Sequence, residues 1–230
     1  IYRMSRSRHF VQHVIIEKNA AETVRKICKR LGVKKLGVEY EALRAADLHG
    51  LKKILKCMDI VDASRIIPEL RTIKDEKEIT ALTKACRVTD AAFTALLRSI
   101  RIGMTEGEIA HFLVDFFHRH ADGSAFAPIV ASGKSAAIPH YCTSKTKKIR
   151  TGEMLLLDFG AQVSGYHADM SRTIFLGKAS ERFKKIYGFV LDAQIKTINA
   201  LRAGMRGEAA DAIARGSLAD PCHPPGRYCS

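Results

Sequence analysis

Two aspartates, Asp158 and Asp169, have the setting in this sequence that most strongly suggests chemistry. Asp158 interrupts the apolar run Met-Leu-Leu-Leu-Asp-Phe, and Asp169 lies in a second strand-like run that follows a Ser-Gly turn signal. A carboxylate inside a buried strand is costly unless a cation or strong hydrogen-bond donors compensate it. Two such carboxylates on one predicted hairpin indicate a shared cation. The simpler alternative is that both aspartates end or cap their strands in contact with water; the depth of Asp158 in its apolar run favours the cation.

The length of the connecting loop decides whether the two carboxylates can meet. Residues two apart along a strand share a face, as do directly opposed residues of a hairpin. A two-residue turn places Gly160 opposite Asp169 with Asp158 one diagonal step away, whereas a four-residue loop opposes the aspartates directly. Either loop leaves their Cβ atoms roughly 5–8 Å apart on one face; a three-residue loop would separate them. Arg172 has the opposite parity, so it is a poor candidate for neutralising Asp169.

Strand and helix patterns alternate in the first part of the chain. Strand-like runs cover residues 10–16, 35–39 and 59–62, and helical spacing covers residues 19–31 and 42–57. This β-α-β-α-β order is typical of α/β structure, although it is too short for a complete doubly wound domain. Pro68 and the polar residues after it mark a change of pattern, and we place a domain boundary near Arg71.

Long amphipathic patterns follow the boundary. We expect helices over residues 75–100, from Thr105 onwards, over residues 180–202 and over residues 208–215, a strand over residues 126–132, and a flexible connection over residues 133–137. Thr105 and Glu108 match a capping box. The first of these helices should bury Ile79, Leu82, Cys86, Phe93 and Leu97. The second should bury Ile109, Phe112, Leu113, Phe116 and Phe117, and the third Phe183, Ile186, Phe189, Val190, Ala193 and Ile198.

Composition restricts the classes of function. The chain has 230 residues, of which 47% are hydrophobic, enough for a folded core. Its six cysteines lack CxxC spacing and indicate reduced thiols in a cytoplasmic protein. No apolar run approaches the ~20 residues of a membrane span. The net charge of +14 would suit a nucleic-acid partner, but the basic residues are dispersed apart from a short cluster at residues 145–150, so we expect neither a nucleic-acid nor a membrane partner.

Several segments together resemble the pita-bread metallopeptidases, in particular the Xaa-Pro branch of prolidases and Xaa-Pro aminopeptidases. They are RTIKDEKEI at residues 71–79, GMTEGEI at 103–109, the Pro-His pair at 139–140, LLLDFGA at 155–161 and GYHADMSRT at 165–173. The resemblance implies a creatinase-like α/β N-terminal part at residues 1–71. Residues 72–218 would be the first portion of an α+β pita-bread catalytic domain, incomplete in its C-terminal half, and residues 219–230 would be an atypical tail.

The resemblance also implies an activity, hydrolysis of peptides with proline at the second position, and a cofactor. Two divalent cations, Mn²⁺ first with Co²⁺ or Zn²⁺ as alternatives, are held in the family by two Asp, one His and two Glu. Asp158 and Asp169 match the two Asp, and His140 matches a histidine that contacts substrate. No residue matches the remaining His or either Glu. His167 shares a face with Asp169, but the family pattern gives it no ligand role, so we expect it to line the site.

The chain begins with Ile1, and the resemblance ends near Leu218. We therefore expect a fragment of a longer parent protein, inactive by itself, whose last residues reflect a frameshift or an alternative end. The resemblance implies a homodimer for the full-length protein and leaves dipeptidase and aminopeptidase activity both open. The competing hypothesis is a non-catalytic pita-bread protein that has lost its metals and binds RNA or protein; Mn²⁺ should raise the melting temperature only of the enzyme.

Overall fold

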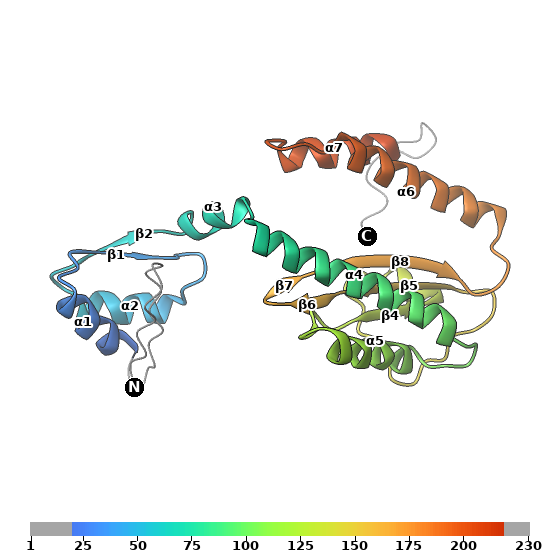
Figure 1. Cartoon of the computed structure of the whole chain (residues 1–230), viewed down its shortest axis with the longest axis horizontal. Coiled ribbons are helices and arrows are strands. Elements are labelled where there is room, and N and C mark those ends of the chain that lie inside the picture. The colour runs from blue at the N-terminus through green and yellow to red at the C-terminus, as the bar shows by residue number, and fades with distance from the viewer. Residues whose placement is uncertain (1–19, 219–230) are drawn as a thin grey trace. The chain divides into compact units, whose positions relative to one another are not determined.

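The computed structural model describes residues 20–218. The strand expected at residues 10–16 and the tail at residues 219–230 lie outside the described residues. The chain divides into two compact units, Ile1–Glu76 and Lys77–Ser230 (Figure 1). The boundary expected near Arg71 falls shortly before this division.

The first unit joins a parallel strand pair to helices. Its elements are α1 (Ala20–Arg30), β1 (Lys35–Val38), α2 (Ala45–Ile54), β2 (Asp59–Asp62) and α3 (Ile66–Thr72). β1 and β2 pair in parallel, and α2 connects them, so the predicted α/β order is confirmed for these residues. Gly32 ends α1 with a φ of 63°, a conformation that glycine adopts readily. The short helix α3 was not predicted because Pro68 suggested a break, but a helix tolerates proline in its first turn.

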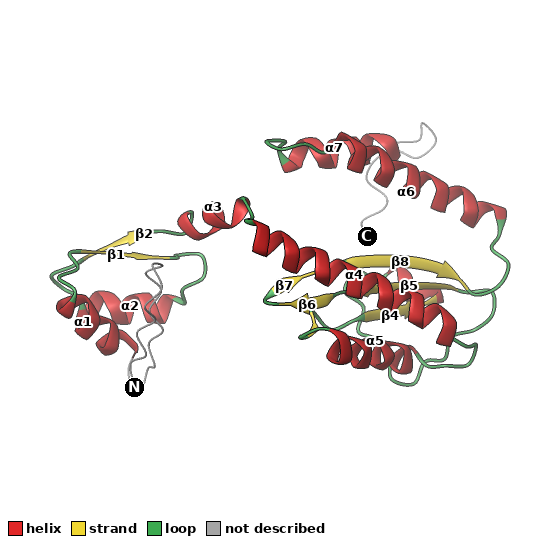
Figure 2. Cartoon of the chain, viewed as in Figure 1, coloured by secondary structure: helices red, strands yellow, loops and turns green. Residues whose placement is uncertain are grey.

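The second unit holds two small antiparallel sheets and four long helices in its described part (Figure 2). The sheets have the strand orders β4-β5-β8 and β3-β6-β7. Its elements are α4 (Glu76–Ser99), α5 (Glu106–His120), β3 (Gly123–Ser124), β4 (Ile129–Ser132), the 3₁₀ helix η1 (Gly133–Ala137), β5 (Met154–Phe159), β6 (Ala161–Val163), β7 (Tyr166–His167), β8 (Met170–Phe175), α6 (Glu181–Ala200) and α7 (Gly207–Leu218).

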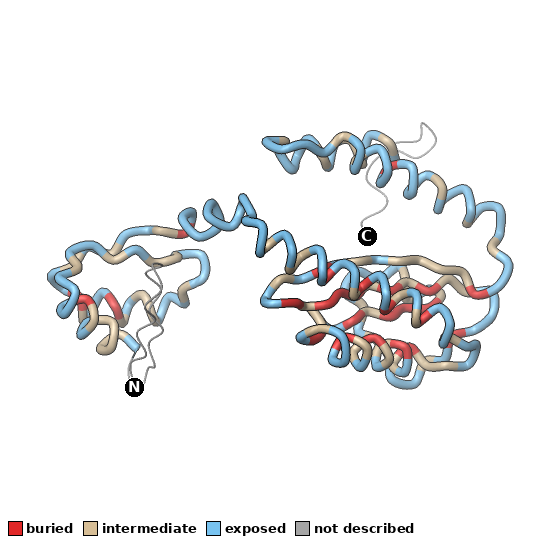
Figure 3. Tube along the Cα trace, viewed as in Figure 1, coloured by how far each residue is buried: buried red, intermediate tan, exposed pale blue. Residues whose placement is uncertain are grey.

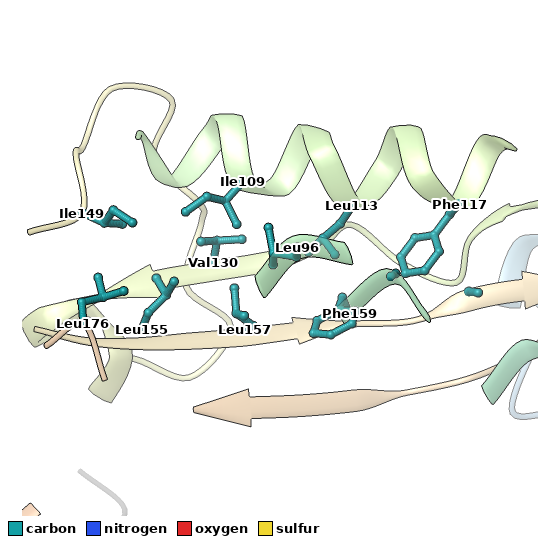
Figure 4. Packing of buried hydrophobic residues seen from close by; sticks show 12 residues of the cluster. Leu96, Ile109, Leu113, Phe117, Val130, Ile149, Leu155, Leu157, Phe159 and Leu176 are labelled. Carbon is teal, nitrogen blue, oxygen red and sulfur yellow. The ribbon is translucent and has the colours of Figure 1, made fainter. Parts of the chain in front are cut away.

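The main hydrophobic core lies between the sheet β4-β5-β8 and the helices α4 and α5 (Figures 3 and 4). Strand β5 alternates in burial, as a sheet with one covered face should. Its covered side carries Leu155, Leu157 and Phe159, and α5 meets them with Ile109, Leu113 and Phe117. Asp158 therefore lies on the opposite face of the sheet from this core.

The buried face of α4 differs from the prediction. Ile79, Cys86 and Leu97 are exposed. The buried residues are instead Ala85, Thr89, Ala92 and Leu96. Small side chains let the helix approach the sheets closely: the Thr89 hydroxyl accepts a hydrogen bond from the Ala161 amide at 3.0 Å and donates to the Ala85 carbonyl at 2.9 Å. The prediction followed the large apolar residues of α4, but the face that contacts the sheets consists mostly of small residues.

The predicted buried face of α6 is also wrong. Of its six predicted residues only Ala193 is buried, while Ile186 and Ile198 are 51% and 59% exposed. α6 packs against α7, and the Phe183 ring lies 5.0 Å from that of Phe175. The spacing selected apolar residues, but burial also requires a covering element, and the elements in residues 20–218 bury only Ala193 among the six.

Other expected elements differ in extent. The strand expected at residues 126–132 is limited to Ile129–Ser132, and the helix expected at residues 42–57 to Ala45–Ile54. The connection expected to be flexible forms the 3₁₀ helix Gly133–Ala137. None of the helices in residues 20–218 is long and apolar enough to cross a membrane.

Candidate active site

The register of the hairpin brings Asp158 and Asp169 onto one face of the sheet. Val163 pairs with Tyr166, which closes a two-residue turn. Asp158 pairs with Ser171 in the same register, so Asp169 is its diagonal neighbour. Of the arrangements that the sequence left open, the two-residue turn is the one observed.

The turn residues have the backbone conformation that such a hairpin requires. Ser164 and Gly165 have φ values of 50° and 79°, and positive φ at both central residues is the mark of a type I′ turn. Serine is an unusual choice there, and its amide donates to the Asp122 carboxylate at 2.5 Å. This bond stabilises the turn that sets the register of the aspartates.

Gly160 allows the two arms of the hairpin to approach closely. A Cβ atom at this position would lie 1.8 Å from the Ala168 carbonyl oxygen. Strand pairing is interrupted here, where β5 of one sheet gives way to β6 of the other. The close approach therefore fixes the backbone next to Asp169 against the strand that carries Asp158.

The two carboxylates repel each other, and the groups around them offset this repulsion only in part. Burial raises the pKa of Asp158, the adjacent Asp169 raises it further, and the Ser171 hydroxyl, 3.2 Å from Asp158 Oδ1, and His140 act in the opposite direction. Within residues 20–218 neither aspartate forms an ion pair with Lys or Arg. The Arg172 guanidinium lies 5.9 Å from the centre of the Phe93 ring, on the core side, as its parity predicted.

This donor set fits a hard divalent cation in part. Carboxylate oxygens suit Mn²⁺ and similar ions, and a cation would relieve the repulsion between Asp158 and Asp169. In the described part of the chain, however, no cluster of three or more His, Cys, Asp or Glu side chains could hold a metal. These residues can therefore supply only part of a coordination sphere.

The two candidate histidines have different surroundings. His140 is exposed, adopts a φ of 52°, and lies close enough to Asp158 to lower that aspartate's pKa. His167 is also exposed, but it pairs with Gln162 in the sheet β3-β6-β7 rather than in the sheet that carries Asp158. Of these two histidines, His140 is the one that acts electrostatically on Asp158.

Glu106 is an important residue that sequence reasoning overlooked. It is 0% exposed at the start of α5. Its Oε1 lies 2.8 Å from the Ser132 amide, 2.7 Å from the Ser132 hydroxyl and 3.1 Å from Lys147 Nζ. Its Oε2 accepts from the Tyr141 hydroxyl at 3.0 Å and from the Ser144 amide at 3.2 Å. Carboxylates are ordinary in the first turn of a helix, so no sequence signal separates buried Glu106 from exposed Glu108.

The environment of Glu106 predicts a pH-dependent contribution to stability. Burial by itself would raise the pKa of Glu106, but hydrogen bonds from Ser132, Lys147 and Tyr141 outweigh it and hold the pKa below its usual value. The stabilisation is therefore present above the unfolded pKa of about 4.3 and is lost as pH falls through the lower folded pKa. We expect Glu106→Gln to reduce the free energy of unfolding at neutral pH by about 2–4 kcal/mol.

Urea unfolding of the parent and Glu106→Gln chains across the acid range measures this effect. The difference in free energy of unfolding should shrink below about pH 4. Glu108→Gln serves as the comparison: hydrogen bonds from Thr105 also lower the pKa of Glu108, but this carboxylate is exposed, so its pH-dependent difference should be smaller. A Glu106→Gln difference that stays constant with pH would contradict the assignment.

Known proteins resemble this chain over most of its length. Residues 80–227 match the profile of metallopeptidase family M24. The Xaa-Pro dipeptidase of Pyrococcus horikoshii is 35% identical over 190 residues, which cover 82% of this chain and 54% of that protein. The solved Xaa-Pro dipeptidase from Bacillus anthracis has 38% identity and a TM-score of 0.81, covering 86% of this chain and 56% of that one. X-Pro aminopeptidase from Thermotoga maritima has 30% identity and a TM-score of 0.82, with the same coverage. The chain thus spans little more than half the length of these relatives.

Proposed function

The chain belongs to metallopeptidase family M24 and has an incomplete pita-bread fold, and from this premise we propose that the full-length protein hydrolyses peptides whose second residue is proline. The observation that supports the proposal best is the Asp158–Asp169 pair, which shares one face of the hairpin and, within residues 20–218, forms no ion pair with Lys or Arg. The names of the relatives include both Xaa-Pro dipeptidases and an X-Pro aminopeptidase, so the proposal covers both modes of cleavage.

Asp158 and Asp169 would hold divalent metal, with Mn²⁺ the first candidate and Co²⁺ or Zn²⁺ as alternatives. Through the family resemblance, the proposal also includes a second ion and three further ligands, one His and two Glu. Within residues 20–218, no group of three or more His, Cys, Asp or Glu side chains could hold a metal. When bound, the metal supplies an activated water molecule and polarises the scissile carbonyl. Ser171 supports this role, because its hydroxyl donates to Asp158 and orients that carboxylate.

His140 would bind the substrate. Its imidazole is exposed, acts electrostatically on Asp158 and can donate a hydrogen bond to a peptide carbonyl oxygen. The peptide bond that precedes proline has no N–H group, so carbonyl contacts must carry most of its recognition. A donor aimed at an oxygen that gains negative charge is worth roughly 10²–10³-fold in rate.

We expect His140→Asn to lower kcat of the full-length gene product for Ala-Pro and Ala-Pro-Ala by roughly 10²-fold. Asparagine is the suitable replacement because it tolerates the left-handed backbone at this position, where φ is 52°. Metal content, measured by atomic absorption, should stay at the parent value. His111→Asn on the exposed side of α5 is the control and should leave kcat unchanged. Loss of metal together with activity would mean that His140 is a ligand instead.

The remaining parts of the proposal concern location and assembly. A cytoplasmic location is supported by Cys28, Cys57, Cys86 and Cys142, which are free thiols in the described part of the chain. The homodimer rests on the resemblance alone. The alternative of a metal-free binding protein is less well supported, because both aspartates and His140 are retained together.

A further inference from the structure

We propose that Glu106 is a positioning residue for His140: its buried carboxylate fixes both ends of the segment that carries the imidazole. This inference rests on the proposed role of His140 in binding substrate. It concerns a residue of the helix α5, which lies on the core side of the sheet and contributes no group to the metal.

The segment leaves the sheet at Ser132, passes through η1 and Pro139, and reaches His140 and then Tyr141. Glu106 binds the residue before this excursion and the residue after it. The amide and hydroxyl of Ser132 donate to Oε1 at 2.8 and 2.7 Å, and the hydroxyl of Tyr141 donates to Oε2 at 3.0 Å. One carboxylate therefore joins the two ends of this loop, and His140 lies at the second end, next to Tyr141.

Lys147 extends this attachment into η1. Its Nζ lies 3.1 Å from Glu106 Oε1, and it donates to the Ser132 carbonyl at 2.6 Å and to the Ser135 hydroxyl at 2.9 Å. The ammonium group thus binds the carboxylate and two residues of the loop at once. Charge-assisted hydrogen bonds of this kind are stronger than neutral ones and restrict geometry.

The attachment also restrains His140, whose backbone conformation is uncommon for a residue other than glycine. Its φ of 52° is unfavourable for a residue with a Cβ atom, and its side chain is exposed rather than packed. Such a conformation persists only where the surrounding structure imposes it. The Tyr141 hydroxyl provides the nearest of these restraints along the chain.

The same carboxylate aligns the loop with the candidate metal ligands. Ser132 ends β4, and β4 pairs with β5 so that Ile129 faces Asp158. By binding Ser132, Glu106 ties the start of the loop to the strand next to Asp158. By binding Tyr141, it ties the end of the loop to the same point. The position of His140 relative to Asp158 is therefore set by Glu106.

Nuclear magnetic resonance of the 230-residue chain tests the proposal without requiring activity. Glu106→Gln should broaden or shift the His140 Cε1–H signal and raise hydrogen exchange at the Ser132 and Ser144 amides at least tenfold. The methyl signals of Leu155 and Leu157 in the core should keep their positions. Tyr141→Phe should change the His140 signal while leaving exchange at Ser132 as in the parent.

Glu108→Gln is the matched control, since Glu108 lies two residues further along the same helix and is exposed. It should leave the His140 signal in place. An unchanged His140 signal in a folded Glu106→Gln chain would overturn the proposal. If Glu106→Gln does not fold, an unchanged His140 signal in Tyr141→Phe overturns it instead.

Activity separates this inference from the proposed function. In the full-length gene product Glu106→Gln should lower kcat for Ala-Pro at least tenfold with metal content unchanged, and Glu108→Gln should stay within twofold of the parent. A normal kcat in Glu106→Gln would overturn the positioning role. The two proposals can also fail separately. If the parent protein hydrolyses no Xaa-Pro peptide, the proposed function is wrong. If the His140 signal still responds to Glu106→Gln in that case, Glu106 nevertheless restrains the loop that carries His140.

Discussion

Replacement of Asp158 by Asn is expected to abolish metal-dependent hydrolysis of Xaa-Pro peptides by the full-length gene product. A bound metal stabilises the charge of the transition state by several kcal/mol, which corresponds to roughly 10³-fold or more in rate. Asn keeps the size of the side chain but removes the negative charge that would bind the cation. Asp169 alone would then have to hold the metal from this hairpin.

This substitution should remove the ligand without damaging the fold. A neutral side chain no longer repels Asp169, and the Asn carbonyl oxygen can still accept the hydrogen bond from the Ser171 hydroxyl. Urea unfolding of the metal-free variant should therefore show a stability at least equal to that of the parent. Asp115→Asn, an exposed position on α5, makes the same change of charge and should retain full activity. Normal turnover by Asp158→Asn would exclude this residue from the ligand set.

Gly160→Ala is expected to cause the largest loss of stability. The added Cβ atom would lie 1.8 Å from the Ala168 carbonyl oxygen, and this neighbour is backbone that cannot rotate away. The strands must then separate where β5 passes into β6, in contact with the core residue Phe159. We expect a reduction of more than about 4 kcal/mol in the free energy of unfolding, the range reached only by severe core disruption.

Gly188→Ala provides the contrasting case in the same chain. Gly188 lies inside α6, and nothing approaches the position of its Cβ within 4 Å. Alanine should stabilise the helix there by about 0.5–1 kcal/mol. Thermal unfolding followed by circular dichroism measures both variants. If the Gly160→Ala chain is as stable as the parent, Gly160 and the Ala168 carbonyl cannot lie as close together as described.

The candidate site was predictable from the sequence where periodicity alone determines geometry. For a connection of two or four residues, though not of three, the twofold period of a strand predicted Asp158 and Asp169 on one face and Arg172 on the other, as observed. The choice between a two-residue turn and a four-residue loop required the structure, because both keep the same parity. The contact of Gly160 with Ala168 could not be predicted, because a close approach of two backbone segments produces no periodic pattern in a single sequence.

Predictions that depended on tertiary partners were less successful. On α4 the sheets contact a face of small residues that includes Ala85 and Thr89, which hydrophobic spacing does not emphasise. On α6 apolar residues were identified, but the elements in the described residues bury only Ala193 among the six. Glu106 was missed because its partners lie 26 to 41 positions further along the chain, so local sequence contains no sign that its carboxylate is buried.

The central claim is that Asp158 and Asp169 share a divalent cation, and Mn²⁺-induced broadening of nuclear magnetic resonance signals of the 230-residue chain tests it most directly. Because the hairpin offers the ion only two carboxylates, binding should be weak, and this method detects weak binding through the paramagnetism of the ion. We expect broadening to centre on Asp158, Asp169 and Ser171, and to disappear there when both aspartates are replaced by Asn. Broadening that persists around Ser171 in the doubly substituted chain, or that centres on another acidic group such as Asp115, would contradict the account.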